Sequence, residues 1–163
     1  MTLIAALFLL IVPLVVLADD DPTFSPDAIV GLWETSHDAD GWSRIAIVAV
    51  DGQYEGRITW INNDVYDHDD PMAGEPVVDR ENPDESLRGQ SLIGLRLMHG
   101  FVHDKQNRWK DGRIYDPNNG KTYRCKLTLK DTGTLEVRGY VKIGFLRPGR
   151  TTTWSRVSPT PEP

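Results

Sequence analysis

The chain has 163 residues, a formal net charge of −6 at pH 7 and a single cysteine. This acidic balance argues against nucleic acid as a partner, because binding it normally needs a basic face. One cysteine cannot form an internal disulfide, so the hydrophobic core and the backbone ladders must stabilise the fold.

The N-terminus predicts a secretory signal peptide. Residues 3–18 form an apolar run without charge, and three aspartates follow directly. Val16 and Ala18 are small residues of the kind found before a signal peptidase site, so cleavage is expected after Ala18. We therefore expect export, to the periplasm or out of the cell, without stable membrane insertion of the mature chain. The remainder is long enough for one domain.

A short helical turn is predicted in the N-terminal segment, residues 19–28. Ser25 stands at an N-cap position and Pro26 at the first helical position, which is the usual order at a helix start. The turn precedes the first predicted strand, so it could plug one end of the domain.

Apolar and polar residues then alternate with a period of two, which indicates antiparallel sheet. Turn residues separate the alternating runs at short intervals, so hairpin follows hairpin. The predicted strands lie near residues 29–36, 43–50, 54–62, 91–99, 108–115, 121–130, 134–142 and 150–157. Cys125 alternates with charged neighbours and is expected in the core.

The expected fold is all-β, an antiparallel up-and-down barrel of about eight strands over residues 29–157. Closing such a meander removes exposed strand edges. The irregular stretch from Asn63 to Gln90 is longer than most loops in a compact domain, so we expect it to be functional or mobile. Residues 158–163, with three prolines, are expected to be a disordered tail.

Two motifs are expected to close the barrel. Gly31 and Trp33 form a G-x-W pattern on the first strand, and Trp154 and Arg156 lie on the last. First and last strands are neighbours in a closed barrel, so Arg156 can stack on the ring of Trp33. We interpret these residues as structural.

Five further motifs follow in chain order: DRENPDESLR (79–88), LIGL (92–95), GRIYDPNNGKTY (112–123), LEVRGY (135–140) and TWSRV (153–157). Together they resemble a family of exported bacterial proteins known as domain of unknown function 2147, over residues 29–157. The resemblance implies a lipocalin-like barrel in the bacterial envelope and supplies no activity or substrate. Asp111 departs from the family pattern, which usually has glycine there, and Gln90-Ser91 stands where Arg-Pro is expected.

Structural roles also explain the residues of these motifs. In the hairpin 114–123, which contains Tyr115, Asp116 is expected to accept backbone N–H groups and Gly120 to adopt a left-handed conformation. Arg88 is expected to hold the carboxylate of Asp79 or Asp84 in two hydrogen bonds, next to a polar turn. The remaining structural candidates are Asn82 and Arg138.

No metal, cofactor or catalytic site is predicted. The acidic cluster at residues 64–70 lacks the spacing of an EF-hand and is better explained as a solvated loop. His99 and His103 are four residues apart, a spacing that brings two ligands close together on one face only in a helix, whereas Gly100 indicates a strand end and turn. No G-x-S-x-G motif occurs.

The first functional hypothesis is a barrel whose interior holds a small apolar or amphiphilic molecule, such as a lipid. Barrels of about eight strands are just wide enough to be filled by side chains or to hold one small ligand. The alternative is a non-enzymatic envelope interaction or stress-related protein with a filled barrel, whose partner docks on residues 63–90. A hydrolase would need a polar pocket with a histidine or paired carboxylates. Possible lining residues are Trp60, Met98, Trp109 and Tyr140.

Overall fold

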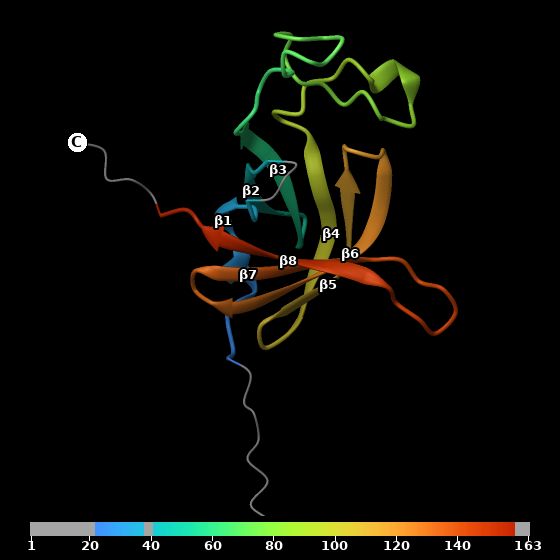
Figure 1. Cartoon of the computed structure of the whole chain (residues 1–163). Helices are drawn as coiled ribbons and strands as arrows, with labels where there is room; N and C mark the ends of the chain where they lie inside the picture. The colour runs from blue at the N-terminus through green and yellow to red at the C-terminus, as the bar shows by residue number, and fades with distance from the viewer. Residues whose placement is uncertain (1–21, 38–40, 159–163) are drawn as a thin grey trace, which may run out of the picture.

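The chain folds into a closed barrel of antiparallel strands, in which each strand pairs with its neighbours in sequence (Figure 1). The computed structural model describes residues 22–37 and 41–158. Its strands are β1 (Gly31–Glu34), β2 (Ser43–Val50), β3 (Gln53–Ile61), β4 (Arg96–Lys105), β5 (Arg108–Asp116), β6 (Lys121–Asp131), β7 (Thr134–Tyr140) and β8 (Gly149–Arg156). The predicted all-β, up-and-down class is confirmed.

Helical structure in the described residues is limited to two short 3-10 helices, η1 (Pro26–Ile29) and η2 (Glu85–Leu87). Neither is long and apolar enough to cross a bilayer. The predicted signal peptide, residues 1–18, and the predicted tail beyond Ser158 lie outside the described residues.

Element η1 covers one end of the barrel, as the sequence predicted. The Pro26 carbonyl accepts a hydrogen bond from the Trp109 indole N–H at 3.0 Å, and Asp27 accepts one from the Tyr54 hydroxyl at 2.7 Å. Ser25 occupies the N-cap position, but its side chain makes no capping hydrogen bond. Proline at the first position and these contacts with the barrel therefore hold the turn in place.

Side chains fill the half of the barrel next to η1. Two strand glycines make this dense packing possible: a Cβ on Gly112 would overlap the Phe101 ring, and one on Gly56 would lie 2.7 Å from the Met98 side chain. Cys125 is fully buried here, as predicted for a core residue. The largest fully buried side chains of the described core are Trp33, Trp109 and Phe101.

The barrel closes where β1 meets β8. Only two residue pairs join these strands, Trp33 with Arg156 and Glu34 with Ser155, whereas seven pairs join β7 to β8. The seam has few ladder hydrogen bonds because β1 is short. Side-chain contacts at this seam therefore matter more for closure than at the other strand pairs.

Arg156 supplies those contacts. Its guanidinium carbon lies 4.2 Å from the centre of the Trp33 ring, which is the contact expected from the sequence. The same guanidinium donates to the carbonyls of Thr132 at 2.6 Å, Val30 at 2.9 Å and Ala28 at 2.5 Å. Gly31 leaves room for it, since a Cβ there would lie 2.7 Å from an Arg156 nitrogen.

Strand β4 lies further along the chain than predicted. Residues 91–95 belong to the preceding loop, because Gly94 has a φ of +91° and interrupts the extended backbone. The alternation there reflects leucines that pack on the core from a loop. Gly100, with a φ of +77°, lies inside β4, so the predicted strand end between His99 and His103 is wrong.

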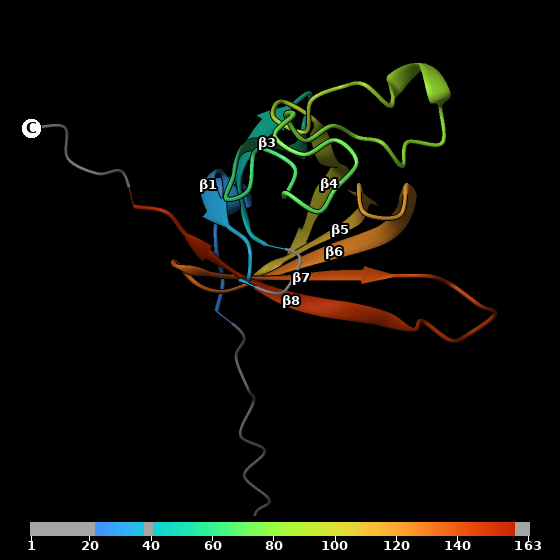
Figure 2. The same cartoon turned by 45° about the horizontal axis from the view of Figure 1, so that its top comes forward.

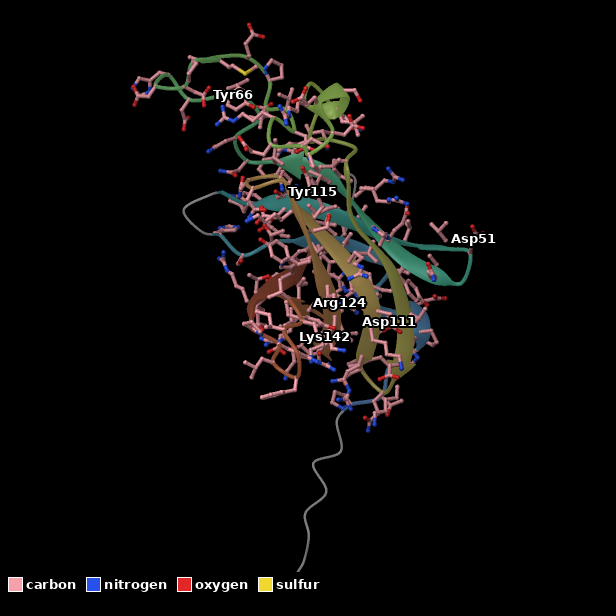
Figure 3. The ribbon with its side chains drawn as sticks, turned by 90° about the vertical axis from the view of Figure 1, so that its right-hand side faces the viewer. Asp51, Tyr66, Asp111, Tyr115, Arg124 and Lys142 are labelled. Carbon is pink, nitrogen blue, oxygen red and sulfur yellow. The ribbon has the colours of Figure 1, made fainter. Side chains whose placement is uncertain are left out.

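A second left-handed position lies in β5. Asp111 has a φ of +64° where the register between β5 and β6 shifts, at Trp109 to Gly112 (Figure 3). A non-glycine residue in this region costs about 1–2 kcal/mol, although aspartate tolerates it better than most. Glycine would adopt this conformation without that cost, which gives a physical reason for the glycine expected at this position from the resemblance.

The long connection between β3 and β4 consists of two lobes. The first lobe, residues 64–77, is a short hairpin closed by the pairing of Val65 with Pro76. The second lobe, residues 78–91, contains η2 and is closed by the pairing of Val78 with Ser91. Figure 2 shows the first lobe above the barrel opening and η2 displaced to one side.

Candidate functional site

The end of the barrel opposite η1 is hollow. A cavity of about 870 Å³ opens there, and its volume falls in the range of small-molecule pockets, roughly 300–1,000 Å³. The barrel is thus filled at one end and open at the other. Apolar side chains of five strands form the inner lining: Ile58, Leu97, Ile114, Val137 and Trp154.

The rim of the cavity comes from the connections β1–β2, β3–β4, β5–β6 and β7–β8, which all lie at this end. Aromatic side chains contribute from each of them or from the adjoining strands, namely Trp42, Tyr66, Tyr115, Tyr123 and Tyr140. Polar and charged groups surround them, including Asn62, Asn63, Asp67, Asp70, Arg80, Asp116 and Arg150. The site is therefore apolar inside and amphipathic at its mouth.

The first lobe is held over the mouth by a small polar cluster. The Arg80 guanidinium lies 4.7 Å from the Tyr66 ring centre and donates to Asp70 at 2.8 Å. The Tyr66 hydroxyl in turn contacts the backbone N–H and carbonyl of Val78, each at 3.3 Å. A hydrogen bond from the backbone N–H of Met72, together with Arg80, lowers the pKa of Asp70, which therefore stays ionised at neutral pH.

The second lobe is joined to the barrel by a buried carboxylate. Asp79 is fully buried and accepts one hydrogen bond from the Tyr115 hydroxyl at 2.7 Å and one from the Asn82 amide at 2.6 Å. Burial first, and then the bond to Asp79, raises the pKa of Tyr115, so this phenol remains a donor. Figure 3 places Tyr115 at the end of the barrel that carries Tyr66.

The turn between β5 and β6 makes a second contact with this lobe. Gly120 has a φ of +66°, as predicted, and a Cβ there would overlap the Glu81 carbonyl oxygen. Asp116 accepts the backbone N–H of Asn118 at 3.1 Å, which confirms its predicted role in the turn. The two longest motifs of the sequence, 79–88 and 112–123, therefore meet in space.

The predicted partner of Arg88 is wrong. Its guanidinium contacts Glu85 at 3.4 Å and the Asn82 carbonyl at 2.9 Å, and neither Asp79 nor Asp84 receives it. Asp84 instead caps η2 by accepting the backbone N–H of Ser86 at 3.0 Å. Short-range bonds therefore organise the turn at Asn82–Arg88, while Asp79 provides the side-chain hydrogen bond to Tyr115 of β5.

Of the four predicted lining residues, Tyr140 lies at the cavity. Met98 and Trp109 point inward but belong to the filled half, where they are at most 1% exposed. Trp60 lies on the outer surface and is 36% exposed. None of these three is among the described residues that line the cavity.

A β-bulge explains the position of Trp60. Ile45 pairs with Ile58 and Arg44 pairs with Trp60, so one extra residue of β3 lies between them and reverses the alternation. Ile61 then faces the cavity, while Trp60 packs against Trp42 at 4.4 Å between ring centres. This cluster supports the rim from outside.

No metal site is found in the described part of the chain, where no three His, Cys, Asp or Glu side chains converge suitably. In the acidic cluster of the first lobe, Asp70 forms an ion pair with Arg80. Among the described ionisable groups, His68 contacts its neighbour Asp69, and both of these side chains are exposed. No histidine or cysteine is among the described residues that line the cavity.

This geometry, a closed eight-stranded barrel with a cavity open at one end, defines a lipocalin-like protein. The chain belongs to the bacterial family described as "Uncharacterized protein conserved in bacteria (DUF2147)", whose model matches residues 31–156. It is also similar to the solved structure of protein HP1028 from Helicobacter pylori, described as belonging to the lipocalin family. That match has a TM-score of 0.66 and 23% identity, over 80% of this chain and 83% of the other. No curated protein matches the chain.

Proposed function

We propose that this protein is exported to the periplasm and binds one small apolar or amphiphilic molecule, such as a lipid, in its barrel. The observation that carries the proposal is the cavity of about 870 Å³ with an apolar interior. Removing apolar surface from water supplies roughly 25 cal/mol per Å², so an apolar guest is the natural occupant. Export is supported by the uncharged apolar run at residues 3–18 and the aspartates after it.

The lining favours binding over catalysis. Its carboxylates among the described residues are Asp67, Asp70 and Asp116, and the last two are already engaged by hydrogen bonds within their own loops. A ligand would place its hydrocarbon portion against Ile58, Leu97 and Val137 and its polar end among the asparagines and charged groups of the rim.

The test is a titration with N-phenylnaphthylamine, a neutral dye whose fluorescence rises in apolar surroundings. Saturable binding of one dye per chain, with a dissociation constant on the order of 1 μM, corresponds to about −8 kcal/mol and is expected for such a pocket. A fatty acid should displace the dye.

A cavity-filling variant makes the test specific. Gly139 lies in the lining, its φ is not positive, and a Cβ there would meet Ile114 at an ordinary 3.6 Å. Gly139→Leu should therefore fold and weaken dye binding at least about tenfold, or 1.4 kcal/mol. Gly89→Leu is the matched control, because Gly89 is exposed in the second lobe with open space around it. Equal affinities of the two variants would exclude the barrel interior as the site.

A further inference from the structure

The hairpin between β7 and β8 exposes a group of apolar side chains. Ile143 is 61% exposed, Phe145 93% and Leu146 56%. Both cartoon views show this hairpin projecting beyond the barrel wall (Figures 1 and 2). Clustered exposed apolar residues of this size mark a surface that meets a partner or a membrane.

The tip is a tight, hydrogen-bonded turn. Ile143 and Leu146 exchange both backbone hydrogen bonds, at 3.0 and 2.9 Å, around Gly144 with a φ of +58°. Glycine with positive φ at the first central position is typical of a type II′ turn, so Phe145 is displayed at the apex. Arg138 supports the base by donating to the Arg147 carbonyl at 3.0 Å.

The charge of this region is opposite to that of the whole protein. Residues 137–158 contain five arginine or lysine residues and no aspartate or glutamate, although the chain has a net charge of −6. Lys142 and Arg147 flank the apolar tip, and Arg150 follows at the start of β8. Figure 3 places Lys142 on this projecting side. Apolar residues flanked by basic ones match the layering of an anionic bilayer, with hydrocarbon beneath phosphate.

We propose that the hairpin tip, residues 141–148, docks this protein onto the surface of an anionic lipid bilayer. Phe145 and Leu146 insert below the headgroups, and Lys142 and Arg147 contact the phosphates. Val141 and Pro148, at the base of the tip, also line the cavity mouth, so docking brings the mouth close to the lipid. The docking requires no ligand in the cavity and is therefore independent of the proposed binding function.

The experiment uses the full chain with an environment-sensitive fluorophore at position 145. Cys125 is fully buried, so Phe145→Cys supplies the reactive thiol. Ile93→Cys is the matched control, since Ile93 is also an exposed apolar residue, at 47%, in the loop before β4. With phosphatidylglycerol vesicles, the dye at position 145 should shift to the blue and the dye at position 93 should not. Neutral phosphatidylcholine vesicles should give a much smaller shift.

Charge reversal tests the basic flank. Each surface cation contributes about 1 kcal/mol to binding an anionic membrane, so Lys142→Glu with Arg147→Glu should lower the apparent vesicle affinity at least about tenfold. Gly139→Leu should bind vesicles as the unmodified chain does. The proposal is overturned by no shift at position 145, by an equal shift at position 93, or by a shift on concentrating the protein without vesicles, which would indicate docking onto a second copy.

Discussion

Replacing Tyr115 by phenylalanine removes a single hydroxyl and leaves the ring in place. That hydroxyl donates at 2.7 Å to Asp79, which is fully buried and, among the described residues, has the Asn82 amide as its one other side-chain donor. A hydrogen bond to a charged group contributes about 1.5–3 kcal/mol, and one oxygen of the buried carboxylate would lose its side-chain donor. We expect Tyr115→Phe to lower the free energy of unfolding by about 2 kcal/mol. For a domain of this size the melting temperature would fall by roughly 8 °C.

The assay is urea unfolding followed by circular dichroism, with Tyr123→Phe as the control. Tyr123 lies on the adjoining strand, and its hydroxyl makes one exposed contact with Asn119 at 3.3 Å. Its loss should cost less than about 0.5 kcal/mol. If the two variants unfold alike, the buried carboxylate does not hold the second lobe to the barrel, and our explanation of the motifs at 79–88 and 112–123 is wrong.

Four further predictions concern stability and reactivity. Arg156→Lys should lower the free energy of unfolding by about 2 kcal/mol in thermal or urea melts, because a lysine cannot reach all three carbonyls that the guanidinium contacts. Burial raises the pKa of Tyr54 to about 12 and also raises that of Tyr115. The contribution of these two phenols to the free energy of unfolding is therefore intact below about pH 10. Above that pH it falls by about 1.4 kcal/mol per pH unit for each tyrosine. Tyr54→Phe should thus roughly halve the slope of the urea-derived free energy of unfolding against pH. Burial likewise raises the pKa of Cys125 to about 12, so Ellman's reagent should label the thiol only at the rate of unfolding, and prompt labelling of the native protein would contradict this. Asp111→Gly should raise the melting temperature slightly, since the left-handed backbone that it relieves costs about 1–2 kcal/mol, whereas the flexibility of glycine in a strand costs only about 0.5–1 kcal/mol.

Much of the fold follows from local chemistry in the sequence. Turn residues and period-two alternation identified the strands, and barrel topology then required the first and last strands to meet, which is why the contact between Trp33 and Arg156 could be predicted. The error in the predicted bounds of β4 has an equally local cause. Gly94 and Gly100 both have positive φ, but one lies in a loop and the other inside a strand, and composition does not distinguish these cases.

The site was less predictable because a lining residue must both face inward, which depends on the alternation along its strand, and lie at the hollow end of the barrel. A single bulge in β3 turned Trp60 outward and Ile61 inward, and such an insertion has no mark in the alternation before it. Met98 and Leu97 are adjacent in sequence and both buried, yet only Leu97 lines the cavity, because Met98 packs into the space over Gly56, where the register between β3 and β4 shifts. The hydrogen bond between Tyr115 and Asp79 joins residues 36 positions apart in the sequence, and no local spacing pattern predicts such a pair.

Native mass spectrometry of the protein purified from its own host tests the ligand-binding account most directly. We predict a reproducible additional mass, the size of a small lipid, on the unmodified chain and its loss from Gly139→Leu, which narrows the cavity. A clean apo mass for the unmodified chain, or the same additional mass on both proteins, would contradict the claim that the hollow end of the barrel holds a ligand.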